Sequence, residues 1–224
     1  MKNQKYIISI LIAGILMVGV SDRIQAKGDD QKAGTVKPAQ AKQLLVEGNA
    51  RFVSGKSIHP RQNADRRSEL TNSQHPFAIV LGCADSRTGP EIIFDQGLGD
   101  LFVVREAGNV IDDHTIGGIE YAVEHVHVKL VVVLGHQRCG AIAAARDTAG
   151  ADGHIKSLLV TIQPAVNATK GQDAEATCKA HVQNMVHALQ TSEPVLKKLV
   201  QSGEIKIVGA YYSLETGAVS FLEE

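Results

Sequence analysis

Two short segments of the chain hold residues that bind transition metals. Cys83 stands in the first segment, and His136 and Cys139 stand in the second. Each segment directly follows an apolar run, at 77–82 and at 130–135, of the kind typical of a buried strand. In an α/β sheet the carboxyl ends of parallel strands lie along one edge, where ligands usually bind. We therefore expect Cys83, His136 and Cys139 to lie close together in the fold.

These three residue types predict a zinc site. Two thiolates and one imidazole suit a zinc ion, and three protein ligands leave one position open for water, as in catalytic zinc sites. A disulfide between Cys83 and Cys139 is the alternative in an oxidising compartment. The intervening His136 and the positions at strand ends favour the metal. The third cysteine, Cys178, stands in a stretch expected to be helical and is interpreted as an unpaired, partly buried thiol.

An acid–base pair accompanies the first thiol. Asp85 and Arg87 follow Cys83 by two and four residues. Arg87 can hold the Asp85 carboxylate through two parallel hydrogen bonds, which would keep it ionised and aimed. Asp85 could then accept a hydrogen bond from the hydroxide that forms at zinc. A surface ion pair without a function is the alternative, and the proximity to a metal thiol argues against it.

The length, the composition and the order of apolar and polar residues limit the possible fold classes. The 224 residues suffice for one sizeable domain, and the net charge of −1 gives no electrostatic reason to expect nucleic acid as a partner. From Pro76 onward strands and helices alternate, which predicts an α/β fold with a mostly parallel central β-sheet flanked by helices. Before Pro76, the spacing of apolar residues predicts an N-terminal helical arm that must pack on its own domain or on a neighbouring subunit.

The expected elements follow from the apolar periodicity and the turn residues. We expect strands at 77–82, 101–104, 130–134, 205–212 and 218–222. We expect helices at 38–52, 63–71, 90–94, 114–125, 139–149, 155–168 and 174–201.

The start of the chain is typical of a signal peptide at 1–26. Lys2 and Lys5 precede an apolar run, and Ala26 is a small residue of the kind that signal peptidase favours. The apolar run is shorter than the roughly 20 residues that span a membrane, although a retained anchor is the alternative. We therefore expect a periplasmic or secreted bacterial protein with no stable membrane insertion after cleavage. Residues 27–37 are polar and predict a flexible leader.

The segments 83–87, Cys-Ala-Asp-Ser-Arg, and 136–140, His-Gln-Arg-Cys-Gly, resemble the metal-binding motifs of the β-class carbonic anhydrases. The similarity extends over 38–224, which is then the catalytic domain. It implies one zinc ion per subunit on Cys83, His136 and Cys139, with Asp85 and Arg87 as the catalytic pair. It also implies reversible hydration of carbon dioxide to bicarbonate and a proton, by a homodimer or homotetramer.

The resemblance assigns a substrate pocket as well. Gln74 matches a glutamine that donates a hydrogen bond to substrate from the adjoining subunit. Phe102 and Tyr121 match the apolar wall for carbon dioxide, and Ala107 matches a smaller wall position, although all could equally be ordinary core residues. The backbone amide of Gly140 begins a helix and could steady a bicarbonate oxygen.

The sequence departs from the family pattern at two points, and two alternative functions stay open. Glu106 stands where the family usually has Asn, and its carboxylate would either repel bicarbonate or relay protons. The chain has no Trp, so the Trp-based, non-catalytic bicarbonate site of one family branch cannot form in its usual way. In some members the aspartate takes the fourth zinc position at low pH, and this sequence does not decide whether Asp85 does. Hydrolysis of carbon disulfide or carbonyl sulfide, and non-catalytic binding of zinc or bicarbonate, are the alternative functions.

Overall fold

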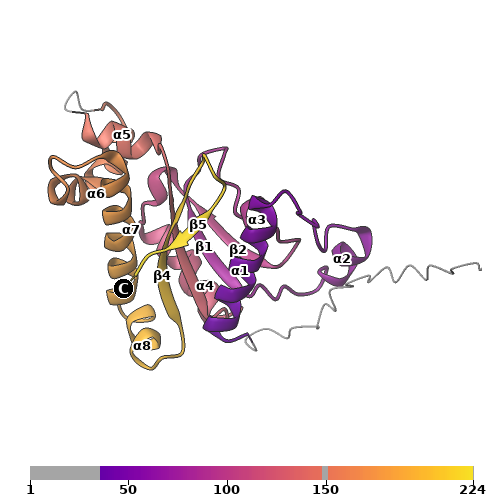
Figure 1. The fold of residues 1–224 in the computed structure, drawn as a ribbon. Helices are drawn as coiled ribbons and strands as arrows, with labels where there is room; N and C mark the ends of the chain where they lie inside the picture. Colours follow the sequence, from indigo (N-terminus) through magenta and orange to yellow (C-terminus); the bar gives the residue numbers. More distant parts are fainter. Residues whose placement is uncertain (1–35, 148–150, 224) are drawn as a thin grey trace, which may run out of the picture. The chain divides into compact units, whose positions relative to one another are not determined.

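The computed structural model describes residues 36–147 and 151–223 (Figure 1). The signal peptide predicted at 1–26 and nearly all of the leader predicted at 27–37 lie outside these residues. Among the helices that the structure describes, none combines the length and the apolar character needed to cross a membrane.

A five-stranded sheet forms the centre of the domain, in the order β2-β1-β3-β4-β5 (Figure 1). The first four strands run parallel, and β5 runs antiparallel to β4 at one edge. This arrangement confirms the mostly parallel α/β sheet expected from the sequence. The strands are β1 (Ala78–Gly82), β2 (Leu101–Arg105), β3 (Leu130–His136), β4 (Lys206–Tyr212) and β5 (Val219–Phe221).

Helices cover both faces of this sheet. Because successive side chains of a strand point to opposite faces, Val80 and Val132 join one buried cluster while Ile79 and Val131 join another. The first cluster lies under α1 and α3, and the second under α4, α7 and α8. The helices are α1 (Pro38–Val53), α2 (Ala64–Glu69), α3 (Pro90–Ile93), α4 (Asp113–Glu124), α5 (Gly140–Arg146), α6 (Ile155–Ala168), α7 (Ala174–Thr191) and α8 (Leu196–Gln201), with a 3-10 turn η1 (Ala107–Asn109).

The N-terminal helical arm packs on its own domain. In α1, Ala41 and Leu45 are fully buried against the sheet. The buried Asn49 side chain donates to the carbonyl oxygens of Ile93, at 3.1 Å, and Gly217, at 2.8 Å. These contacts join α1 to α3 and to the turn before β5. Helix α1 therefore completes one face of the sheet, whereas α2 buries no residue.

One predicted helix is wrong. The sequence favoured a continuous helix over 174–201, whereas the structure ends α7 at Thr191 and begins α8 at Leu196. Pro194 stands in the gap. Proline has no backbone N–H and disfavours the helical conformation of the residue before it, which favours a break at this position.

Candidate metal centre

The topology of the sheet brings the two motifs together. The chain leaves β1 toward β2 on one side, whereas β3 pairs with β1 on the other side. Such a reversal opens a crevice at the carboxyl ends of the two strands, which is where ligands bind in open α/β sheets. Cys83 directly follows β1, and His136 is the last residue of β3. The fold thus places both at the reversal point.

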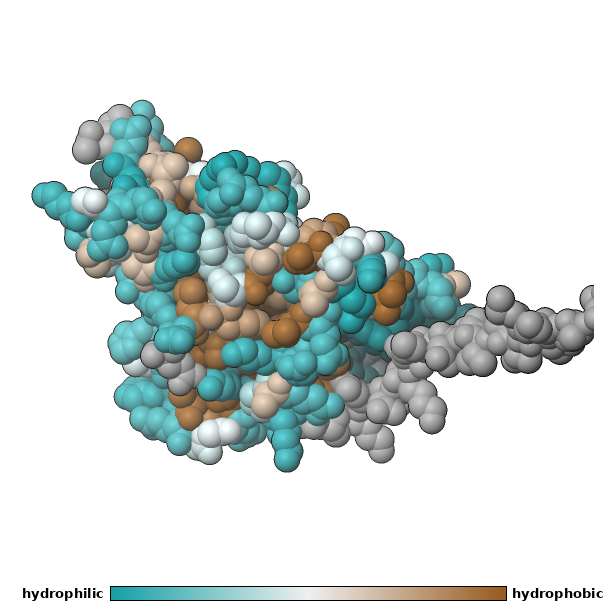
Figure 2. Space-filling model, in the orientation of Figure 1, coloured by the Kyte–Doolittle hydropathy of each residue, from teal (hydrophilic) through white to brown (hydrophobic). Residues whose placement is uncertain are grey.

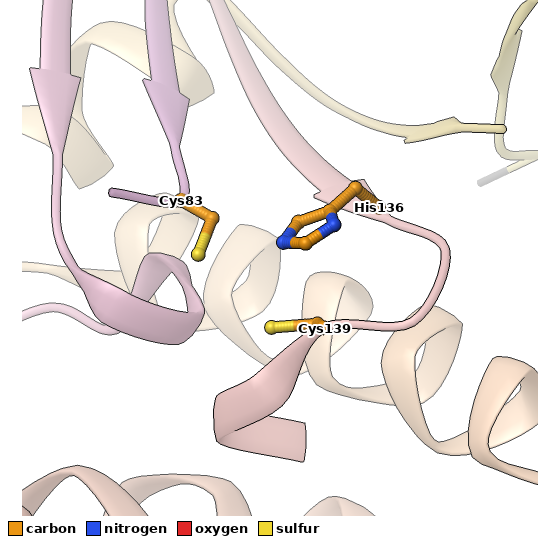
Figure 3. A group of neighbouring side chains, drawn as sticks. All are labelled: Cys83, His136 and Cys139. Atoms are coloured by element: carbon orange, nitrogen blue, oxygen red, sulfur yellow. The ribbon is translucent and has the colours of Figure 1, made fainter. Parts of the chain in front are cut away.

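Three candidate ligand atoms converge there. The sulfurs of Cys83 and Cys139 and a ring nitrogen of His136 lie within 4.8 Å of one another (Figure 3). All three residues are buried, with at most 5% of their surface exposed. The structure therefore brings together the three residues that the sequence singled out.

The imidazole is oriented as a metal ligand. His136 Nδ1 lies 2.9 Å from the carbonyl oxygen of Gln137, an acceptor, so this nitrogen carries the proton. Nε2 then presents its lone pair toward the sulfurs, and it is buried without a hydrogen-bond partner. Because buried polar atoms are rarely left unpaired, this orphaned nitrogen beside two thiols fits a zinc ion.

The two thiols shift each other's pKa in opposite directions. A hydrogen bond from Cys139 lowers the pKa of Cys83 to about 4, although burial opposes this shift. The same hydrogen bond raises the pKa of Cys139. The backbone amides of Asp85, at 3.4 Å, and Gly108, at 3.2 Å, also donate to the Cys83 sulfur. The thiolate that a metal needs is thus already stabilised at Cys83.

Arg87 fixes the Asp85 carboxylate beside these ligands. Its Nε lies 2.9 Å from Oδ1, and its Nη2 lies 2.6 Å from Oδ2. The hydrogen bond from the Arg87 side chain holds the pKa of Asp85 far below its usual range, so the carboxylate is ionised. Oδ2 lies 4.0 Å from His136 Nε2. An anionic acceptor therefore borders the place where the three ligands converge.

Two residues that were not predicted from the sequence hold this loop in place. Arg105 donates from Nε to the carbonyl oxygen of Cys83, at 2.8 Å, and from Nη2 to that of Asp85, at 2.6 Å. The buried Thr88 hydroxyl donates to the same Asp85 oxygen at 2.9 Å. The position of Arg105 at the end of an expected strand was the one feature of the sequence that could have indicated a role at this edge of the sheet. Thr88 had no such feature.

The third thiol lies behind the site. Cys178 is 3% exposed, so it is more deeply buried than the sequence predicted, and burial raises its pKa to about 12. It donates weakly to the carbonyl oxygen of His136, at 3.5 Å, and does not belong to the convergent group. Its place is in the packing of α7 against β3.

The structure separates the predicted pocket residues into two sets. Ala107 and Gly140 adjoin the ligands, because Gly108 contacts Cys83 and Gly140 follows Cys139.

The other three lie away from the ligands of their own chain. Gln74 is exposed and precedes β1. The whole length of β1, about 17 Å at 3.3 Å per residue, therefore separates Gln74 from Cys83. Phe102 pairs with Ile79, near the start of β1, and is partly buried against the cluster under α4. Tyr121 is 52% exposed on α4. A single chain therefore leaves this side of the predicted pocket incomplete.

Known proteins match this fold and these motifs together. The sequence model of the carbonic anhydrase family matches residues 78–219, which include all three convergent residues. Carbonic anhydrase 2 of Mycobacterium tuberculosis is 41% identical over 187 residues, covering 80% of this chain and 90% of the relative. The chain belongs to the carbonic anhydrase family. A carbonic anhydrase of Mycolicibacterium smegmatis is also 41% identical, over 81% of this chain and 92% of its own length.

Solved structures place this carbonic anhydrase family member in the β class by fold. A β-carbonic anhydrase of Coccomyxa, solved with acetazolamide, has a TM-score of 0.66 at 25% identity, over 80% of this chain and 85% of that chain. A β-carbonic anhydrase of Sordaria macrospora has a TM-score of 0.67 at 22% identity, over 82% and 97%. The β-class fold inferred from the motifs is confirmed.

Proposed function

We propose that the chain hydrates carbon dioxide reversibly to bicarbonate and a proton, with one zinc ion per subunit on Cys83, His136 and Cys139. The observation that carries this proposal is the buried, unpartnered Nε2 of His136, which faces two sulfurs and lies 4.0 Å from an ionised carboxylate. A purely structural zinc site would have four protein ligands. Only three metal-ligating side chains converge among the residues that the structure describes.

Different residues of the chain have different roles in the proposed reaction. When bound, zinc supplies a Lewis acid that lowers the pKa of water to near neutrality. Asp85, held ionised by Arg87, accepts a hydrogen bond from the attacking water and so orients its lone pair toward carbon dioxide. A proton leaves through the Asp85 side of the site or to buffer. In this proposal the backbone amide of Gly140, an exposed residue at the start of α5, donates to a bicarbonate oxygen.

The apolar side of the pocket requires a second subunit in this proposal. Gln74 and Phe102 lie toward the far end of β1 from the ligands of their own chain, and Tyr121 is half exposed. Apolar residues, coloured brown, are also exposed on the side of the molecule that Figure 2 shows. Val46 in α1 is 41% exposed and Ile92 in α3 is 67% exposed. The Sordaria relative is described as tetrameric. These features support a homodimer or homotetramer in which Gln74, Phe102 and Tyr121 serve a neighbouring site.

Export to the periplasm or beyond is a separate proposal that rests on the sequence of 1–26. Cell fractionation and N-terminal sequencing of the mature protein test it. A mature chain that begins after Ala26 supports export, and a cytoplasmic chain that retains Met1 contradicts it.

The activity is tested by stopped-flow carbon dioxide hydration on protein of measured zinc content. We expect one zinc per chain, turnover that falls with chelation, and recovery on adding zinc. Hydrolysis of carbon disulfide without hydration would support the alternative reaction instead. Because Cys83 and Cys139 are free thiols in the structure, quantifying thiols in the same sample tests the disulfide alternative.

A further inference from the structure

A buried histidine outside the metal-binding group lies close to it. His181 is on α7 and is fully buried. Its Nε2 lies 2.9 Å from the carbonyl oxygen of Gly108. Since a carbonyl can only accept, Nε2 carries the proton and donates it. The other ring nitrogen, Nδ1, is buried with no hydrogen-bond partner.

This arrangement is costly to stability and therefore needs an explanation. Burial lowers the pKa of His181, which keeps the ring neutral. In that state Nδ1 is an acceptor that has left water without gaining a partner, and an unsatisfied buried acceptor destabilises a fold. An apolar side chain at this position would avoid the penalty. What the imidazole alone provides is the hydrogen bond to Gly108.

The peptide group of Gly108 links this hydrogen bond to the metal site. The Gly108 amide donates to the Cys83 sulfur at 3.2 Å, while its carbonyl accepts from His181. Gly108 has a φ of +70°, a conformation that favours glycine. A Cβ there would lie 2.9 Å from the Cβ of Ala141 and 3.0 Å from Ile162. The turn is thus packed from α5 and α6 and anchored from α7.

We infer that His181 is a positioning residue, which holds the Gly108 amide on the Cys83 sulfur and so tunes that sulfur as a zinc ligand. The inference deepens the proposed function and rests on it. A hydrogen bond to a thiolate draws electron density away from sulfur, which weakens its donation and leaves the metal a stronger Lewis acid. Residues that orient metal ligands in this way commonly change metal affinity or activity 10- to 100-fold when mutated.

Two substitutions of His181 by neutral amide side chains distinguish the loss of this hydrogen bond from the loss of packing. In H181Q the side-chain NH₂ can reach the position of Nε2, whereas in H181N the shorter side chain cannot. M185A, which removes another buried side chain from α7, serves as a control for lost packing. Each variant is purified with zinc and also with cobalt, whose charge-transfer absorption reports directly on the metal–sulfur bond.

For H181N we expect zinc affinity about 10-fold weaker by chelator competition, because the Cys83 ligand is no longer held in its orientation. We also expect the sulfur-to-cobalt band at longer wavelength and the midpoint of the pH–rate profile at higher pH. H181Q should resemble wild type in all three, and M185A should lose thermal stability with an unchanged cobalt spectrum. Identical cobalt spectra and zinc affinities for H181N and H181Q would overturn the inference. Spectra and affinity do not depend on turnover, so a wild-type protein that binds metal without hydrating carbon dioxide would count against the proposed reaction alone.

Discussion

Arg87 binds both carboxylate oxygens of Asp85, at 2.9 Å and 2.6 Å, and its backbone amide donates to Oδ1 at 3.0 Å. Three hydrogen bonds from one residue leave the carboxylate little freedom to turn. In the proposed mechanism Asp85 acts through its charge and direction, and Arg87 supplies both.

Asp85→Asn therefore removes the anionic acceptor while keeping the shape of the side chain. We expect zinc content to stay at one per chain and the hydration rate to fall about 100-fold, the range typical of a lost proton acceptor. Stopped-flow assays with metal analysis on the same sample measure both. Asp65→Asn, on the exposed surface of α2, is the matched control and should keep the wild-type rate. Full turnover in Asp85→Asn would show that the carboxylate has no part in the reaction.

His181 gives a pH dependence of stability whose sign follows from burial. Its pKa in the folded state lies below the ordinary value of 6.5. As the pH falls below 6.5, the unfolded chain takes up a proton at this site before the folded protein does, so the free energy of unfolding decreases. Denaturant unfolding at pH 8 and pH 5 should show a larger loss for wild type than for His181→Asn. Equal losses in the two proteins would mean that His181 titrates normally in the fold.

Two helical glycines predict opposite effects of the same substitution. A Cβ at Gly48 in α1 would lie 1.8 Å from the carbonyl oxygen of Phe94, a backbone atom that cannot move aside cheaply. Gly117 in α4 is exposed, and a Cβ there would point into open space beyond its own helix. We expect Gly48→Ala to destabilise the protein by about 3 kcal/mol or more, because α1 must leave α3. Gly117→Ala should stabilise it by about 0.5–1 kcal/mol. Thermal unfolding of both variants checks the packing of the N-terminal arm, and similar shifts would contradict it.

The buried Cys178 predicts a change in stability without a change in metal content. Its thiol contacts the backbone of β3 and stands outside the convergent group. We expect Cys178→Ala to lose about 1 kcal/mol of stability from the small cavity and to retain full zinc content. Zinc loss in a folded Cys178→Ala protein would show that the third thiol is a ligand after all.

Local patterns in the sequence were enough to predict the sheet and the convergence of the metal-binding residues. The apolar runs before Cys83 and His136 identified two parallel strands, and strand ends in such a sheet share one edge. The break between α7 and α8 could also have been read from Pro194. These features depend on neighbours in sequence, or on a general rule of sheet topology.

The supporting contacts could not be predicted, because they join positions far apart in the chain. His181 and Gly108 are separated by 73 residues, and Arg105 reaches Cys83 across 22 residues. No pattern around either residue indicates its partner. The exposure of Tyr121 is a further example, since its environment in an oligomer depends on a second chain rather than on its own sequence neighbours.

The most direct test of the central claim is paired zinc analysis and stopped-flow hydration of wild type and His136→Ala. His136 supplies a nitrogen that is buried, unpartnered and aimed at both sulfurs. The proposal predicts one zinc per wild-type chain with rapid hydration, and loss of both in a His136→Ala protein that remains folded by circular dichroism. A folded His136→Ala protein that keeps its zinc and its rate would contradict it.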